Sequence, residues 1–106
     1  MKIISTKMEG LYVGETNFNT DDRGSFSRLF CKQDLSLAIG NRDIVQINLS
    51  QTKTPGVIRG IHFQYSPHAE MKLVRCVKGR SWDLVVDLRA GSPTFLQWHA
   101  EELSPQ

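Results

Sequence analysis

The clearest pattern in the chain is an alternation of polar and apolar residues, which is typical of β-strands. In residues 46–50, Ile47 and Leu49 occupy one face and three polar side chains occupy the other. Similar segments follow at residues 57–64, 72–77 and 82–88. Turn-forming Pro, Gly and Ser residues separate these segments. Short strands at this spacing predict an all-β, antiparallel sandwich or barrel.

One segment has helical character instead. Residues 32–39 carry apolar side chains at helical spacing, and Gly40 follows them at the position where a glycine commonly ends a helix. The sequence therefore predicts a single short helix near residues 32–39 within an otherwise all-β chain.

The polar faces of the predicted strands leave two alternatives open. Gln46 and Asn48 share one face, and His62 and Gln64 share another. If these faces point inward they line a polar pocket, and if they point outward they are solvated. Because the opposite faces are apolar, they need a second layer or a partner subunit to cover them.

Length and charge restrict the classes of function. The chain has 106 residues, which is one domain or part of one. Its net charge is +2, from 13 Lys and Arg against 11 Asp and Glu, which is too small an excess to drive nucleic-acid or membrane binding. We therefore expect neither nucleic acid nor a membrane as a partner.

The terminus and the cysteines indicate the compartment. Residues 1–7 lack the apolar run of a signal peptide, and no stretch approaches the roughly 18 apolar residues of a membrane span. Cys31 and Cys76 are far apart and form no Cys-x-x-Cys pair, so two reduced, buried thiols are expected. These features predict a cytoplasmic location.

Five motifs carry a resemblance to a known family. They are residues 22–26 (Asp-Arg-Gly-Ser-Phe), 46–50 (Gln-Ile-Asn-Leu-Ser), 56–64 (Gly-Val-Ile-Arg-Gly-Ile-His-Phe-Gln), 72–75 (Lys-Leu-Val-Arg) and 87–94 with its Ser-Pro-Thr ending. In this order they resemble dTDP-4-dehydrorhamnose 3,5-epimerases. The resemblance implies a cupin-like antiparallel jelly-roll. Because the family's chains are longer, it also implies that residues 1–106 form a single, partial, truncated domain.

The resemblance implies catalytic roles for two residues. His62 matches the family's base, and imidazole has a pKa suited to removing a proton next to a ketone. Lys72 matches the active-site lysine and can stabilise an enolate oxygen as a cation. The implied reaction is epimerisation of a dTDP-4-keto-6-deoxyhexose through proton abstraction α to the C4 ketone.

The resemblance also implies a nucleotide-sugar site. Arg59 and Arg23 are expected to bind phosphate, which guanidinium groups grip well. The further substrate contacts expected are Phe26, Gln46, Ile47, Asn48 and Gln64. In the family the strand that carries the residue matching Arg23 reaches the neighbouring subunit, so a homodimer with shared sites is implied.

We expect no cofactor and no metal. Many cupins bind a metal through a His-x-His pair, but here Gln64 replaces the second histidine. Lys72 would also repel a divalent cation.

The family's proton-donating tyrosine and the carboxylate that orients its histidine are expected to lie beyond residue 106. This leaves an alternative function, a truncated and non-catalytic relative that acts as a nucleotide-sugar binding or assembly module. A half-built sheet also predicts a homodimer or higher homo-oligomer, which either buries Ile61, Phe63, Leu84 and Val86 or exchanges the N-terminal strands. Outside the matched roles, Arg89 and residues 92–94 are expected to be structural, and His68 and His99 to be exposed.

Overall fold

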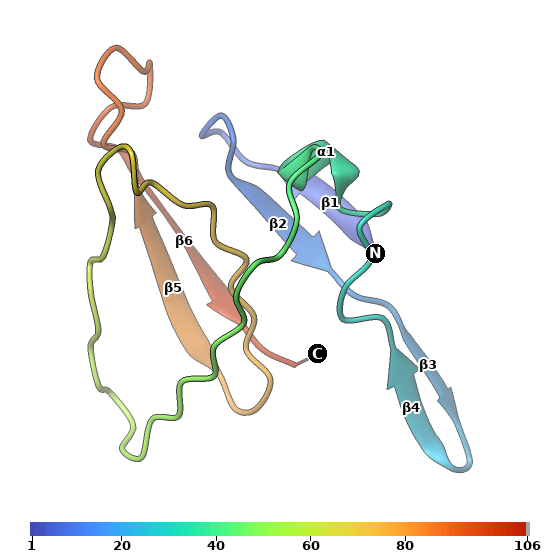
Figure 1. Ribbon diagram of the computed structural model, residues 1–106. Coiled ribbons are helices and arrows are strands. Elements are labelled where there is room, and N and C mark those ends of the chain that lie inside the picture. The colour runs from blue at the N-terminus through green and yellow to red at the C-terminus, as the bar shows by residue number, and fades with distance from the viewer. Residues whose placement is uncertain (106) are drawn as a thin grey trace.

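The structure, a computed structural model, describes residues 1–105 (Figure 1). Six strands form three separate two-stranded antiparallel sheets, and one helical turn lies between the second sheet and the third. The elements are β1 (Lys2–Ser5), β2 (Tyr12–Glu15), β3 (Phe18–Asp21), β4 (Gly24–Ser27), α1 (Ser36–Ile39), β5 (Ser81–Val86) and β6 (Trp98–Leu103). The prediction of a nearly all-strand, antiparallel chain with one short helix is thus confirmed.

The first hairpin, β1–β2, is closed by a hydrogen-bonded turn. Ile4 is paired with Val13 across the two strands. In the turn, Thr6 Oγ1 donates to the carbonyls of Met8 (3.1 Å) and Leu11 (3.0 Å) and accepts from the Met8 amide. These bonds satisfy the backbone of the turn, and Met8 is one of the few buried side chains.

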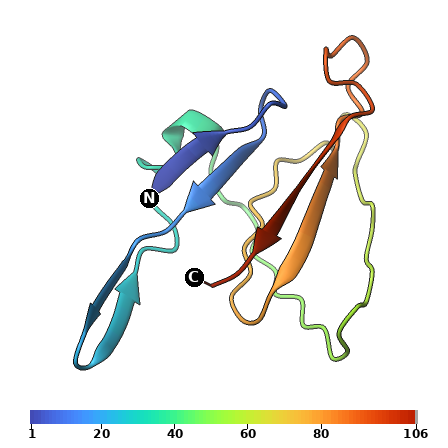
Figure 2. The same ribbon diagram turned by 180° about the vertical axis from the view of Figure 1, so that it is seen from behind.

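The other two hairpins point in different directions. The β3–β4 hairpin projects away from the rest of the molecule in both views, and β5–β6 lies on the other side of β1–β2 (Figures 1 and 2). In β5–β6, Leu84 is paired with Ala100 and Val85 with His99. The strands β2 and β6 are the inner strands of their hairpins in both views.

The helix is shorter than predicted. Residues 32–35 form turns rather than helix, and α1 spans only Ser36–Ile39. The predicted helix end is confirmed, because Gly40 has a φ of 59° and its amide donates to the Ser36 carbonyl. Leu35, just before the helix, is 2% exposed and forms part of the small core.

Three of the four predicted strands are wrong as regular elements. Residues 46–50, 57–64 and 72–77 lie in a long irregular segment, residues 41–80, that loops past β5 (Figure 1). A strand requires a hydrogen-bonded neighbour, and these segments have none among the described residues. The fourth prediction, residues 82–88, corresponds to β5, which ends at Val86 because Asp87 begins a turn.

The core is very small for the length of the chain. Among the described residues, only Met8 and Leu35 are buried apolar side chains. The radius of gyration is 15.4 Å, against about 13 Å for a compact domain of this length. Both the polar and the apolar sides of residues 46–50 are exposed, so neither side faces a core.

Candidate functional site

His62, the predicted base, lies in the irregular segment and is exposed. Its backbone position depends on Gly60, which has a φ of +106°. A Cβ at Gly60 would lie 3.4 Å from the His62 amide nitrogen and 3.6 Å from Nδ1 of the ring. Glycine therefore provides both the left-handed backbone and the space beside the imidazole.

Lys72, Glu70 and Gln64 form a polar cluster on the same segment. The Lys72 ammonium lies 3.2 Å from Glu70 Oε1. With its amide nitrogen turned toward Glu70, Gln64 donates to Glu70 Oε1 at 3.1 Å and to the His68 carbonyl at 3.2 Å. Two of the predicted site residues, Lys72 and Gln64, are thus brought together by the carboxylate of Glu70, which was not among the predicted site residues.

The two predicted phosphate ligands hold different partners. Arg59 Nη2 donates to the Gln51 carbonyl at 3.3 Å. Arg23, at the tip of the β3–β4 hairpin, donates from Nε to Asp21 Oδ2 at 3.1 Å, and its amide donates to Asp21 Oδ1 at 2.9 Å. These hydrogen bonds from Arg23 hold the pKa of Asp21 below its usual value. Both guanidinium groups are on exposed residues and are accessible to an anion.

The remaining predicted contacts are also exposed. Phe26 is 72% exposed, and Ile47 is 85% exposed between the exposed Gln46 and Asn48. Phe26 lines a cavity of about 160 Å³ beside Arg28 and Asn19. Of the predicted site residues, only Phe26 lines either of the two cavities described among residues 1–105.

Positive charge is concentrated around the candidate site. Residues 51–80 contain six Lys and Arg and one acidic residue, Glu70, although the whole chain has a net charge of only +2. This segment carries Arg59, His62 and Lys72. A local excess of this kind attracts anions such as a diphosphate.

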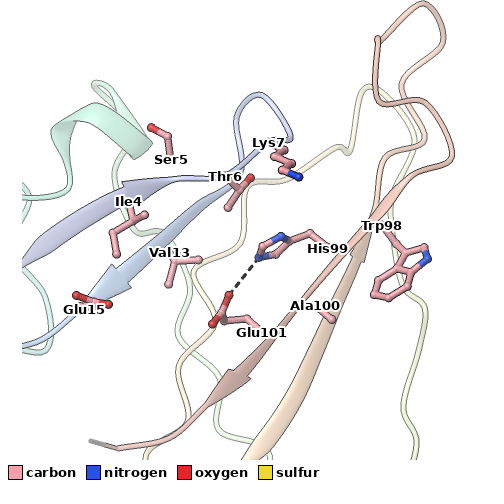
Figure 3. A pocket seen from close by; sticks show the side chains of 10 residues that line it. All are labelled: Ile4, Ser5, Thr6, Lys7, Val13, Glu15, Trp98, His99, Ala100 and Glu101. Atoms are coloured by element: carbon pink, nitrogen blue, oxygen red, sulfur yellow. Dashed lines mark hydrogen bonds and ion pairs between the residues drawn. The ribbon is translucent and has the colours of Figure 1, made fainter.

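The larger cavity is a cleft of about 550 Å³ between β1–β2 and β6 (Figure 3). Ile4 and Val13 line one wall. On the other wall, His99 Nε2 lies 3.2 Å from Glu101 Oε2, and both side chains point toward the first hairpin. The expectation that His99 is exposed is wrong, since it is half-buried, whereas His68 is exposed as expected. The two-residue spacing of His99 and Glu101, which places both on one face of a strand, is the sequence signal for this pair.

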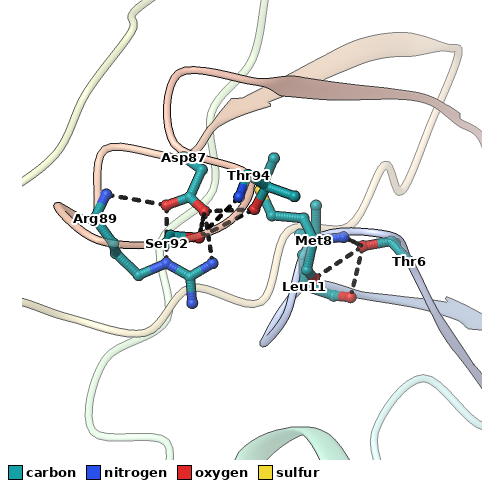
Figure 4. A network of polar contacts seen from close by, with 7 residues as sticks. All are labelled: Thr6, Met8, Leu11, Asp87, Arg89, Ser92 and Thr94. Carbon is teal, nitrogen blue, oxygen red and sulfur yellow. Dashed lines mark hydrogen bonds and ion pairs between the residues drawn. The ribbon is translucent and has the colours of Figure 1, made fainter.

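The turn after β5 is the most strongly bonded polar cluster in the described part of the chain (Figure 4). Asp87 is 3% exposed. It accepts hydrogen bonds from Arg89 Nε and Nη2 (both 2.8 Å), Ser92 Oγ (2.6 Å) and Thr94 Oγ1 (2.7 Å). These donors, Arg89 foremost, hold the pKa of Asp87 far below its usual value. The predicted strand end and turn are found here, and the structural role of Arg89 and residues 92–94 stays a prediction.

This turn also contacts the first hairpin. A Cβ built on Gly10 would lie 3.7 Å from Arg89 Nη1, so the β1–β2 turn approaches the Arg89 guanidinium closely. In Figure 4 the side chain of Met8 extends toward Thr94. The contact joins the first hairpin to the turn that follows β5.

Neither the cysteines nor a cluster of metal ligands adds a further site among the described residues. Cys31 and Cys76 are free and half-buried. Within residues 1–105, no three His, Cys, Asp or Glu side chains are grouped so that they could hold a metal ion. No helix in this part of the chain is long and apolar enough to cross a membrane.

Comparison with known proteins identifies the fold and the family. The model of the family "dTDP-4-dehydrorhamnose 3,5-epimerase" matches residues 5–106. A dTDP-4-dehydrorhamnose 3,5-epimerase from Shigella flexneri is 39% identical over 107 residues, which cover 100% of this chain and 59% of the relative. One from Streptomyces griseus is 39% identical over 97 residues, which cover 91% of this chain and 48% of the relative.

Solved structures of dTDP-4-dehydrorhamnose 3,5-epimerases agree with this family match. The crystal structure of the epimerase from Bacillus anthracis, with TDP and PPi bound, has a TM-score of 0.91 and 38% identity, covering 98% of this chain and 59% of its own. The structure of the epimerase from Elizabethkingia anophelis has a TM-score of 0.88 and 38% identity, and the match covers 99% of this chain and 57% of that one. The fold is therefore part of the cupin fold of nucleotide-sugar epimerases. The chain belongs to the dTDP-4-dehydrorhamnose 3,5-epimerase family. It spans somewhat more than half the length of several of these relatives.

Proposed function

We propose that this chain provides the base and the enolate-stabilising group of a nucleotide-sugar 3,5-epimerase site. The observation that carries the proposal is the family match over residues 5–106, a range that includes His62 and Lys72. The proposed substrate is a dTDP-4-keto-6-deoxyhexose. The Bacillus anthracis relative was crystallised with TDP and PPi, which supports a thymidine nucleotide as the ligand.

The chemistry is a proton transfer at the carbons next to the C4 ketone. His62 accepts a proton from C3 or C5, and the electron pair of the broken C–H bond moves to the ketone oxygen as an enolate. Lys72 stabilises that oxygen as a cation. A proton from solvent, returned to the opposite face of the carbon, completes the inversion, and His62 releases the proton it accepted to solvent. Arg59 and Arg23 hold the diphosphate, with Phe26, Gln46, Ile47, Asn48 and Gln64 as the remaining contacts.

The proposed assembly is a homodimer or higher homo-oligomer in the cytoplasm. Exposed Ile61 (64%), Phe63 (53%) and Leu84 (41%), with half-buried Val86, support self-association because their burial removes apolar surface from water.

The test is solvent-proton exchange. The chain is incubated with dTDP-4-keto-6-deoxyglucose in deuterated water, and NMR follows deuterium at C3 and C5. His62→Ala is expected to reduce exchange by about 10²-fold or more, the usual contribution of a general base. His68→Ala is the matched control, since His68 is an exposed histidine on the same segment and has no proposed role.

A second candidate is a non-catalytic nucleotide-sugar binding or assembly module. It is favoured by the exposure of both His62 and Lys72, because a site open to water loses much of the electrostatic stabilisation on which enolate formation depends. Binding of dTDP without exchange supports this candidate. Exchange that persists in His62→Ala contradicts the assignment of the base.

A further inference from the structure

Glu70 supplies the one carboxylate in the segment that carries the proposed base and the proposed enolate-stabilising lysine. Residues 51–80 contain six Lys and Arg and no other Asp or Glu. The side chains of Glu70 and Lys72 are both about half exposed, at 52% and 49%. A negative charge here weakens the attraction of the segment for a diphosphate, so charge alone does not explain a carboxylate at this position.

A single oxygen of Glu70 contacts two of the predicted site residues. The Lys72 ammonium lies 3.2 Å from Glu70 Oε1, and the side-chain amide of Gln64 donates to the same oxygen at 3.1 Å. An exposed ion pair on its own holds a lysine only weakly. The second donor restricts where Oε1 can lie, and the ammonium therefore has a partner in a defined place.

The turn between Gln64 and Glu70 is closed by further contacts. The Gln64 amide also donates to the His68 carbonyl at 3.2 Å, and the His68 backbone amide donates to the Tyr65 carbonyl at 2.8 Å. The rings of Phe63 and Tyr65, on either side of Gln64, pack edge to face with their centroids 5.0 Å apart. These contacts order the turn that the Gln64–Glu70 hydrogen bond spans.

This turn also separates the two proposed catalytic groups along the chain. His62 precedes Gln64 by two residues, and Lys72 follows Glu70 by two residues. A base and an enolate-stabilising cation are effective only when their spacing matches the substrate. The Gln64–Glu70 hydrogen bond joins the two ends of the turn and so restricts this spacing.

We infer that Glu70 is a positioning residue of the epimerase site, and that its Oε1 atom holds Lys72 and Gln64 in place relative to each other. The inference rests on the proposed function, because it concerns the lysine assigned there to the enolate oxygen. Glu70 acts through these two side chains and does not itself contact the substrate.

Two variants separate geometry from charge. Glu70→Gln keeps an oxygen that can accept from both donors but removes the charge, whereas Glu70→Ala removes both. At saturating dTDP-4-keto-6-deoxyglucose in deuterated water, exchange at C3 and C5 is expected to fall about tenfold in Glu70→Ala with little change in KM. In Glu70→Gln the rate should return to within about threefold of the parent chain.

The control is Asp43→Ala, which removes the carboxylate partner of Lys32 in an exposed ion pair outside this segment. It makes the same change in net charge as Glu70→Ala and should leave the exchange rate unchanged. Equal rates and equal KM values in Glu70→Ala and Glu70→Gln would overturn the inference, because the carboxylate would then act through its charge alone. A rate in Glu70→Ala equal to that of an active parent chain would also overturn it.

NMR tests the same contacts without substrate. The signals of the Gln64 side-chain amide and of the Lys72 ammonium should shift in Glu70→Ala, shift less in Glu70→Gln and stay unchanged in Asp43→Ala. Signals from both side chains that do not move in Glu70→Ala would overturn the inference. A parent chain that gives no exchange at C3 and C5 would instead contradict the proposed function, so the two failures are distinct.

Discussion

Arg59 is the residue on which nucleotide binding should depend most. Its guanidinium is exposed and, within residues 1–105, is held by one 3.3 Å hydrogen bond to the Gln51 carbonyl, so it can turn toward a diphosphate at little cost. Arg59→Ala is expected to weaken dTDP binding by about tenfold or more, the usual value of a charge-assisted hydrogen bond. Isothermal titration calorimetry measures the change.

Two variants make the Arg59 result specific. Arg59→Lys keeps the charge but loses the two-pronged geometry, so it should restore only part of the affinity. Arg42→Ala removes a guanidinium that donates to the Ile39 carbonyl beside α1 and should have no effect. Equal losses of dTDP affinity in Arg42→Ala and Arg59→Ala would mean that binding depends only on the total positive charge of the chain.

Gly60 is expected to determine the position of the His62 ring. Gly60→Ala forces a side chain into a φ of +106° and places a Cβ 3.6 Å from His62 Nδ1. The variant should shift the NMR signals of the His62 imidazole and reduce substrate exchange. Gly56→Ala is the matched control, because Gly56 also has a positive φ, +77°, but has nothing within 4 Å of an added Cβ. A shift of the His62 signals in both variants would assign the effect to backbone strain alone.

At the scale of the element, the turn after β5 predicts a pH dependence of stability. The folded-state pKa of Asp87 is lowered from 3.8, so its hydrogen bonds stabilise the fold fully above the unfolded value. As the pH falls below about 4 toward the folded pKa, that contribution is progressively lost. The free energy of unfolding, measured by urea titration, should therefore decrease between about pH 5 and pH 2.

Variants of the same turn isolate this contribution. Asp87→Asn should lower the urea midpoint at pH 7 and make its acid dependence shallower. Thr94→Ala removes one 2.7 Å donor and should have a smaller effect, which Thr94→Ser restores because the hydroxyl is kept. An acid dependence equal in Asp87→Asn and the parent chain would assign it to other carboxyl groups, such as Asp21 and Asp34, whose pKa values are also lowered.

Elements were predictable from the sequence where their stabilisation is local. The end of the helix at Gly40 and the bonded turn after β5 depend on neighbouring residues, and both follow the sequence pattern. The strands expected at residues 46–50 and 57–64 depend on a partner strand, and residues 1–105 provide none, so alternation alone misidentified them. The strands β1–β4 have four residues each, which is too short for a clear alternation of polar and apolar residues.

For the candidate site too, some features could be predicted from sequence motifs and others depend on how side chains are placed in the structure. Motif order was sufficient to identify the family, which the match over residues 5–106 confirms. The link from Gln64 to Lys72 through Glu70 and the His99–Glu101 pair arise from side-chain placement that no motif encodes. The catalytic roles of His62 and Lys72 remain predictions, since both side chains are exposed.

At the scale of the whole molecule, the open apolar surface predicts self-association of the chain on its own. Water contact with Ile61, Phe63 and Leu84 is unfavourable, and each buried side chain of this size contributes about 1.5–3 kcal/mol when fully covered. The mass measured by light scattering should rise above that of a monomer as concentration increases through the micromolar range.

Phe63→Ser and Leu84→Ser should lower that mass, whereas Phe18→Ser, on the projecting β3–β4 hairpin, should not. A folded monomer at every concentration, or an equal effect of Phe18→Ser, would contradict burial through this face.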